Sequence, residues 1–237
     1  YAPPVLANIG GKDQLVVWYD IALVGLDPNS GEQLWSYAFP EAKPQRPVVS
    51  IVPPHVVDNR IFITNYYHGS ALIEVDDGNV TELWTSEDNK GHREDINSIM
   101  STVINKPGHY IGVAGNGEFR CVRDEDGSLV WRSYQALATA DEDPDSIPRG
   151  TSGFPALFIT EQNGRFWLFT DLGDLILANL SVKGYEELGR AQLLETTGTT
   201  RGRDYVWCPP AFANGRLYVR NERELICVDM RAESYQN

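Results

Sequence analysis

The stretch from Gly25 to Trp35, GLDPNSGEQLW, decides how this chain folds. Its centre consists of Asp, Pro, Asn, Ser and Gly, the residues that β-turns favour, and strand-forming residues flank it on both sides. The stretch therefore predicts two short strands joined by a tight turn, with Trp35 closing the unit.

The same eleven-residue frame recurs along the chain. Copies cover 74–84 (EVDDGNVTELW), 121–131 (CVRDEDGSLVW) and, more loosely, 178–188 (ANLSVKGYEEL), and a worn copy begins at Cys227. Their starts are 49, 47, 57 and 49 residues apart. Repeats of about 40 to 50 residues, each holding several short strands, are the sequence signature of a β-propeller. Stacking such sheets around an axis buries apolar faces that no single sheet could bury alone.

We therefore predict an all-β fold, a single β-propeller of four-stranded antiparallel sheets (blades). About four and a half blades are expected in residues 1–237. The predicted repeats cover approximately 1–38, 51–86, 98–134, 152–193 and 206–230. At the end of the recurring frame stand Trp35, Trp84, Trp131 and, in the fourth repeat, Leu188. These large side chains are expected to dock between adjacent blades.

Three polar segments interrupt the repeats. The first, 86–95, follows Trp84. The second, 138–149 (ATADEDPDSIPR), explains why the third and fourth copies start 57 residues apart, and the third, 196–204 (TTGTTRGRD), precedes the last repeat. Exposed loops are the expected structure for all three, and loops at blade edges are where a propeller can place binding groups.

Composition excludes several classes of function. A formal net charge of −13 argues against nucleic-acid binding and against docking on an anionic membrane surface. The apolar runs are too short for a transmembrane helix, so no membrane insertion is expected. No signal peptide is recognisable, and the opening at Tyr1 in mid-pattern suggests a processed or truncated chain.

Three cysteines, Cys121, Cys208 and Cys227, leave at least one thiol without a partner in the chain. Cys121 and Cys227 hold the same place in their repeats, among apolar neighbours. Buried, inert thiols are therefore predicted in preference to a disulfide framework.

The frame Gly25-x-Asp27-x-x-Ser30-Gly31-x-x-x-Trp35 resembles the tryptophan-docking motif, Ala-x-Asp-x-x-Thr-Gly-x-x-x-Trp, of the pyrroloquinoline-quinone (PQQ)-type propellers. The other copies depart from it, with Val80 at the Gly place, Arg123 at the Asp place and no Trp in the fourth. The ending, VWCPPAFANGRLYVRNERELICVDM over 206–230, resembles the last blade of PQQ-binding-like repeat proteins.

The resemblance implies the C-terminal part of a longer propeller, because members of this superfamily usually have seven or eight blades. It also implies that an N-terminal strand completes the last blade, which would explain why no outer strand follows Val228. A closed five-bladed ring is the alternative. A periplasmic or extracellular location follows from the resemblance.

The enzymatic branch of this superfamily holds PQQ over Ca²⁺, with a catalytic Asp and often an adjacent Cys-Cys disulfide. No two cysteines are adjacent here, and no Glu, Asn and Asp set matches the calcium ligands. The histidines His55, His68, His92 and His109 lack metal-ligand spacing, and no nucleophile has a His and an acid at recognisable offsets. No catalytic, cofactor-binding or metal-binding residue is therefore predicted. The alternative is a PQQ-dependent alcohol dehydrogenase-like enzyme whose cofactor residues lie on blades outside this chain.

The resemblance extends to the propeller lipoprotein of the outer-membrane β-barrel assembly machinery, which has this repeat and no cofactor. It favours a non-catalytic binding or scaffold role in the cell envelope, with a protein partner or self-association. Most candidate partner-binding residues are Arg, Tyr or Trp, the types that dominate interface energetics, and the others lie beside such residues in the same loops. They are Tyr66, Tyr67, His68, Arg93, Asn97, Arg149, Arg201 and Trp207. Ordinary blade packing is the alternative for each.

Overall fold

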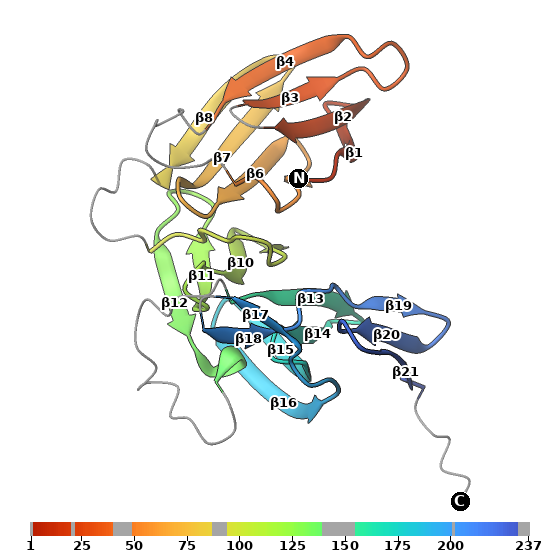
Figure 1. Ribbon diagram of the computed structural model, residues 1–237. Coiled ribbons are helices and arrows are strands. Elements are labelled where there is room, and N and C mark those ends of the chain that lie inside the picture. Colours follow the sequence, from red (N-terminus) through yellow and green to blue (C-terminus); the bar gives the residue numbers. More distant parts are fainter. Residues whose placement is uncertain are drawn as a thin grey trace, which may run out of the picture.

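The computed structural model describes residues 2–19, 22–39, 49–86, 94–138, 155–200 and 202–231. They form four four-stranded antiparallel sheets, a two-stranded hairpin and a three-stranded sheet. Within every sheet the strands are hydrogen-bonded in chain order. The sheets follow one another along an arc, from the first at one end to the last at the other (Figure 1). The prediction of an all-β propeller is confirmed.

The strands of the first two sheets agree closely with the turn pattern of the sequence. The first sheet holds β1 (Val5–Ile9), β2 (Lys12–Tyr19), β3 (Ala22–Leu26) and β4 (Gln33–Ala38). The second holds β5 (His55–Val57), β6 (Arg60–Asn65), β7 (Gly69–Asp76) and β8 (Asn79–Thr85). Left-handed residues such as Asp58 and Gly78 make the tight turns between strands possible.

The remaining sheets repeat this arrangement. The third sheet holds β9 (Ile104–Lys106), β10 (His109–Val113), β11 (Phe119–Arg123) and β12 (Leu129–Ser133), and a 3₁₀ turn, η2 (Gln135–Leu137), follows it. The fourth holds β13 (Leu157–Gln162), β14 (Arg165–Thr170), β15 (Asp174–Ser181) and β16 (Gly184–Gln192). The hairpin β17 (Gly198–Thr200) and β18 (Arg203–Tyr205) precedes the fifth sheet, β19 (Ala211–Ala213), β20 (Arg216–Arg220) and β21 (Leu225–Asp229).

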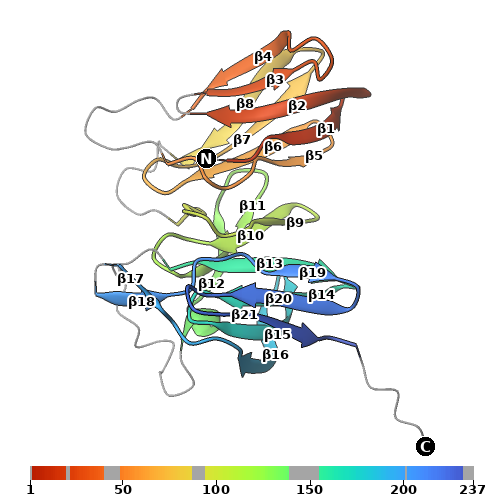
Figure 2. The same ribbon diagram turned by 45° about the vertical axis from the view of Figure 1, so that its right-hand side comes forward.

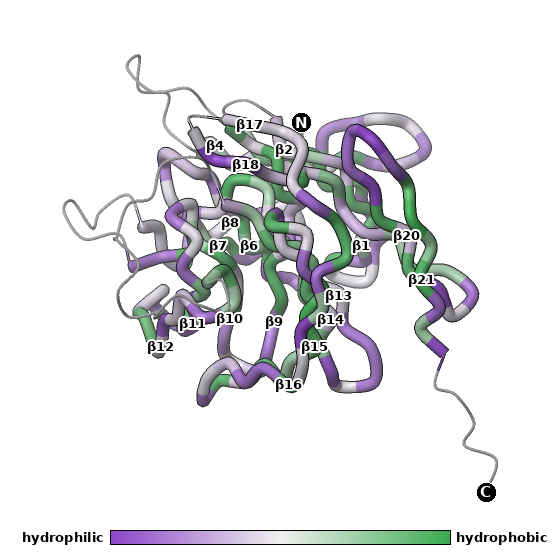
Figure 3. Tube along the Cα trace, turned by 60° about the horizontal axis from the view of Figure 1, so that its bottom comes forward, coloured by the Kyte–Doolittle hydropathy of each residue, from purple (hydrophilic) through white to green (hydrophobic). Residues whose placement is uncertain are grey.

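The core lies between successive sheets. Each of the four apolar clusters draws its buried residues mainly from two neighbouring sheets, as Phe62 and Tyr110 do between the second and third. Similar clusters join the first sheet to the second, the third to the fourth and the fourth to the fifth. The strands therefore carry most of the hydrophobic residues and the turns at their ends are mostly hydrophilic (Figure 3).

Two recurrent tryptophans dock on the next sheet through their indole N–H. Trp84 Nε1 donates to the carbonyl oxygen of Asp124 at 2.9 Å, and its ring packs against Gly127 so closely that a Cβ there would lie 2.9 Å away. Trp131 Nε1 donates to the carbonyl oxygen of Ser181 at 3.1 Å. Each tryptophan of β8 and β12 thus anchors the outer turn of the following sheet.

Trp35 is buried between the first and second sheets but, unlike Trp84 and Trp131, forms its indole hydrogen bond within its own sheet. It is only 4% exposed, and its Nε1 donates to Gln14 Oε1 of its own sheet at 2.7 Å. The ring lies over Gly25, where a Cβ would come within 2.2 Å of ring atoms. Glycine therefore replaces the alanine of the related motif because the indole occupies the space of the methyl group.

Leu188 does not lie between sheets as expected, since its side chain is 43% exposed. The register of β15 and β16 shifts at this point, with Leu177 opposite Gly189 and Ala178 opposite Glu187. Leu188 is therefore the extra residue of a β-bulge, which turns its side chain out of the face that packs. Structurally it matches Leu34 rather than Trp35, because Leu34 is the bulge residue of β4.

Two further expectations need correction. Part of the predicted polar loop 196–204 forms the hairpin β17–β18. Cys227 is exposed and not buried, because it lies on the edge strand β21, on the side away from the fifth sheet's core.

Cys121 is buried, and burial raises the pKa of its thiol to about 11. The acidic loop 138–149 lies, beyond Ala138, outside the described residues.

Gly25→Ala restores the alanine of the related motif and is nevertheless expected to destabilise the protein by about 1–3 kcal/mol, because the new methyl group overlaps Trp35. Urea unfolding followed by tryptophan fluorescence measures the loss. Gly189→Ala is the matched control in a strand, since nothing lies within 4 Å of its Cβ position. Gly25→Ala should cost less when Trp35 is replaced by Phe, and an equal cost in both backgrounds would contradict the steric explanation.

Candidate functional site

In the second to fifth sheets of the propeller, the second turn lies at the end of the strands where each sheet begins. Because antiparallel strands alternate in direction, the β6–β7, β10–β11, β14–β15 and β20–β21 turns share this end with the segments that link successive sheets. We call it the loop face, and the opposite end the turn face. In Figure 2 the hairpin β17–β18 marks the loop face, while the β1–β2 and β19–β20 turns lie on the other side.

The structure places five of the eight candidate partner-binding residues at the loop face. They are Tyr66, Tyr67, His68, Asn97 and Trp207. Arg93, Arg149 and Arg201 lie outside the described residues. The first four belong to one contiguous cluster between the second and third sheets, whereas Trp207 follows the hairpin β17–β18.

The turn that carries the two tyrosines is held from inside by Asn65. Its Oδ1 accepts hydrogen bonds from the backbone N–H of Tyr67 at 3.0 Å and of His68 at 3.3 Å. His68 is buried, and the two tyrosine rings meet edge to face with centroids 4.7 Å apart. An Asn side-chain oxygen that accepts these backbone hydrogen bonds takes the place of a backbone carbonyl and so stabilises the turn locally. Tyr66 and Tyr67 are consequently presented on a defined backbone and remain half-buried.

Asn97 links this turn to the third sheet. Its Nδ2 donates to the carbonyl oxygen of Tyr66 at 3.2 Å, and its Oδ1 accepts from the N–H of Gly115 at 3.4 Å. The Tyr66 ring covers Gly115, where a Cβ would lie 2.2 Å from the ring. Only glycine permits this contact, so the β6–β7 and β10–β11 turns are packed directly on each other.

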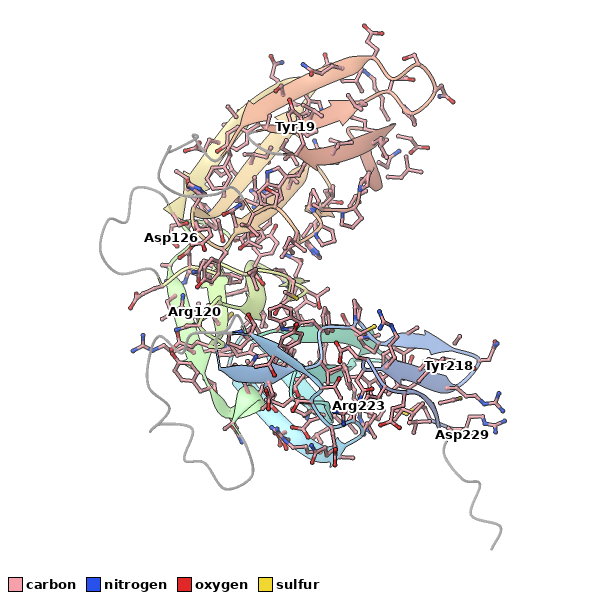
Figure 4. The ribbon with its side chains drawn as sticks, viewed as in Figure 1. Tyr19, Arg120, Asp126, Tyr218, Arg223 and Asp229 are labelled. Atoms are coloured by element: carbon pink, nitrogen blue, oxygen red, sulfur yellow. The ribbon has the colours of Figure 1, made fainter. Side chains whose placement is uncertain are left out.

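A buried ionic cluster supports the same region and was missed from the sequence. Arg120 Nε donates to Glu118 Oε2 at 2.6 Å, and its Nη1 donates to the carbonyl oxygen of Asp95 at 2.5 Å. Ser86 Oγ donates to Asp95 Oδ2 at 2.7 Å. Arg120 is labelled in Figure 4, inside the third sheet.

The polar and apolar pattern around these charges is misleading. Alternation of polar and apolar residues over 118–121 predicts a half-buried strand with Glu118 and Arg120 in solvent. The structure buries both faces, because sheets pack on either side of the third sheet. Buried charges are tolerated here since each makes charge-assisted hydrogen bonds.

A second ion pair anchors the hairpin β17–β18. Arg203 Nη1 and Nη2 contact Asp171 Oδ2 and Oδ1, each at 2.6 Å, in a two-pronged arrangement. Asp171 is fully buried, and its Oδ2 also accepts from the N–H of Ala156 at 2.8 Å. The backbone N–H of Val206 donates to the Asp171 carbonyl oxygen at 2.7 Å. One aspartate of the β14–β15 turn therefore fixes the whole connection between the fourth and fifth sheets.

The hairpin presents a stacked aromatic pair. The rings of Tyr205 and Trp207 lie 3.9 Å apart at an interplanar angle of 22°, and Tyr205 packs over Gly198. Both aromatic residues remain half-buried. Together with Tyr66 and Tyr67, they give the loop face two aromatic pairs on well-supported turns.

The described residues show neither a metal cluster nor a membrane-spanning helix. No group of three or more His, Cys, Asp or Glu side chains in these segments is arranged to hold a metal ion. Within the same segments, no helix has the length and apolar character needed to cross a bilayer.

The stacked antiparallel sheets define a PQQ-like β-propeller. The sequence profile of the family described as outer membrane protein assembly factor BamB matches residues 2–142, more than half of the chain, and the chain belongs to this family. The crystal structure of BamB from Moraxella catarrhalis is similar in fold, with a TM-score of 0.59 and 15% sequence identity. The similarity covers 96% of this chain and 57% of that chain, so this chain spans little more than half of that protein's length. No curated protein matches the sequence.

Arg203→Lys is expected to destabilise the protein by about 3 kcal/mol, because a lysine cannot form both contacts with the buried Asp171 carboxylate. Urea unfolding measures the loss, and hydrogen exchange should show the amides of β17–β18 losing protection first. The control is Arg231→Lys, which alters a similar pair with Asp229 whose arginine side chain is 64% exposed. That change should have little effect on stability, because solvent screens an exposed pair. Equal losses for the two variants would contradict an anchoring role for Arg203.

Proposed function

We propose that this chain is a non-catalytic scaffold propeller of the cell envelope, in the periplasm or at the cell surface, that binds a protein partner during assembly of outer-membrane proteins. Membership of the BamB family supports the envelope and assembly part of this proposal. The chain spans little more than half of the similar structure, so the partner that we propose is a partner of the whole protein.

The observation that carries the binding role is the pairing of aromatic side chains with rigid support at the loop face. Tyr66 and Tyr67 lie on a turn fixed by Asn65 and Asn97. Tyr205 ends the hairpin that the Arg203–Asp171 pair fixes, and Trp207 follows it. Tyr and Trp dominate interface energetics, and anchors held in place before binding lose little conformational entropy when a partner docks.

The loop face is also the end at which a partner meets several sheets at once. Hydrogen bonds connect its elements across sheet boundaries. The Asn97 side chain bonds to both Tyr66 and Gly115, and Ser101 Oγ accepts from the N–H of Leu157 at 2.9 Å. A partner that contacts both aromatic pairs would span the second to the fifth sheet. Such a broad, continuous surface fits protein binding, which requires roughly 800 Å² on each side.

We expect a photo-crosslinking amino acid at Tyr67 or Asp204, both at the loop face, to capture a component of the outer-membrane assembly machinery in the native envelope. The matched control replaces Lys183, an exposed residue of the β15–β16 turn on the turn face. Crosslinked products are identified by mass spectrometry, using the full-length protein expressed in its own host.

Strong capture of the same component from Lys183, or none from the two loop-face positions, would overturn the proposed surface. A product between two copies of this chain would indicate self-association instead. Quinone absorbance in the purified protein, with Ca²⁺-dependent dye reduction, would overturn the non-catalytic role.

A further inference from the structure

A groove of about 540 Å³ opens on the turn face, between the second and third sheets. Its walls are the β5–β6 turn, the end of β7, the β9–β10 turn and the start of the β11–β12 turn. This volume falls within the range of about 300 to 1,000 Å³ that is usual for ligand sites. The groove lies at the opposite end of the strands from the loop face and is independent of the function proposed there.

The charges lining the groove are mainly negative. Arg60 is the cation among the lining residues, and the carboxylates are Asp58, Glu74 and Asp124. Arg60 contacts Glu74 Oε1 at 3.4 Å and Asp124 Oδ2 at 3.3 Å. The second oxygen of each of these two carboxylates accepts no hydrogen bond from the residues that the structure describes. Arg60 is thus already neutralised, while acceptor capacity remains.

Tyr110 contributes a hydroxyl to the groove. Only 1% of the residue is exposed, its ring stacks on Phe62 with centroids 4.4 Å apart, and His55 meets its edge at 6.0 Å. Among the described residues none forms a hydrogen bond with its Oη. Burial, then the negative charge of Asp124, raises the pKa of the hydroxyl to about 12, so it stays protonated at neutral pH. Tyr110 lines the groove, so a ligand there can supply the hydrogen bond that its hydroxyl lacks within these residues.

We propose that this groove binds the guanidinium or ammonium group of a basic peptide segment, contributed by a protein partner. Excess carboxylate favours a cation, and the Glu74 and Asp124 oxygens offer charge-assisted hydrogen bonds at the rim. The Tyr110 hydroxyl is an additional acceptor deeper in the groove. The volume exceeds that of one side chain, so flanking peptide backbone can pack against Pro107 and Gly108.

The indole N–H of Trp84 is a natural reporter for binding, because it donates to the Asp124 carbonyl oxygen beside the groove. The probe is an acetylated and amidated Gly-Arg-Gly-Arg-Gly peptide, titrated into ¹⁵N-labelled protein. Its citrulline counterpart has nearly the same shape without charge. We expect a saturable shift of the Trp84 indole signal with the arginine peptide, weakened by added salt, and none with the citrulline peptide.

Asp124→Asn and Tyr110→Phe should each weaken binding about fivefold to tenfold. The first removes a negative charge that attracts the cationic ligand, and the second removes the hydroxyl that hydrogen-bonds to it. Glu74→Gln provides a third test if either variant folds poorly. Asp126→Asn is the matched control, since Asp126 is on the same turn outside the groove and its Oδ1 accepts from the Ser128 N–H at 2.9 Å, a bond that asparagine retains. Asp126 is labelled in Figure 4.

Three outcomes would overturn the proposal. Equal binding of the citrulline peptide would exclude recognition of charge, and equal weakening by Asp126→Asn would indicate general attraction to an acidic surface. If spermidine binds more tightly than the peptide and responds to the same variants, the ligand is a free polyamine and not a protein segment. Loss of binding with Asp124→Asn and retention with Asp126→Asn supports the proposal.

Discussion

The fold depends on the burial of each sheet's apolar face against the next sheet. A four-stranded sheet has two faces, and in this chain the neighbouring sheets supply the apolar surface that covers them, as Phe119 and Phe166 do between the third and fourth. Side chains that would be exposed in an isolated sheet are therefore core residues. Tryptophans such as Trp84 strengthen the contact with a hydrogen bond to the next sheet's turn. With the faces used for packing, only the two ends of the strands and the outer edges remain for function.

Local chemistry explains why so much of the fold could be predicted from the sequence. Turn residues such as Pro28 and Gly31 mark where strands end, and the recurring tryptophans reveal the period, because both signals act within a few residues. Long-range effects account for the errors. Burial of Glu118 and Arg120 depends on two neighbouring sheets, and exposure of Leu188 depends on a one-residue bulge that an eleven-residue frame cannot show.

The residues of the candidate site were chosen from the sequence by type and position, and their binding role stays a prediction. Aromatic and arginine residues in loops pointed to the Tyr66–Tyr67 turn and the neighbourhood of Trp207. The sequence could not reveal what holds them in place, because Asp171 and Arg203 are 32 residues apart and each resembles an ordinary turn or loop residue on its own. The same holds for the groove on the turn face, whose lining residues come from four segments between Val57 and Asp124.

The two ends of the strands use charge in opposite ways. At the loop face, Asp171 and Glu118 are buried with arginine partners at close distance, an arrangement that contributes geometric definition more than net stability because desolvation offsets the attraction. At the turn face, Arg60 shares two partly exposed carboxylates at longer distances, so these groups can exchange partners at little cost. A fixed aromatic surface suits the protein interface proposed at the loop face, whereas loosely paired carboxylates beside the Tyr110 hydroxyl suit the weaker, reversible contact proposed at the turn face.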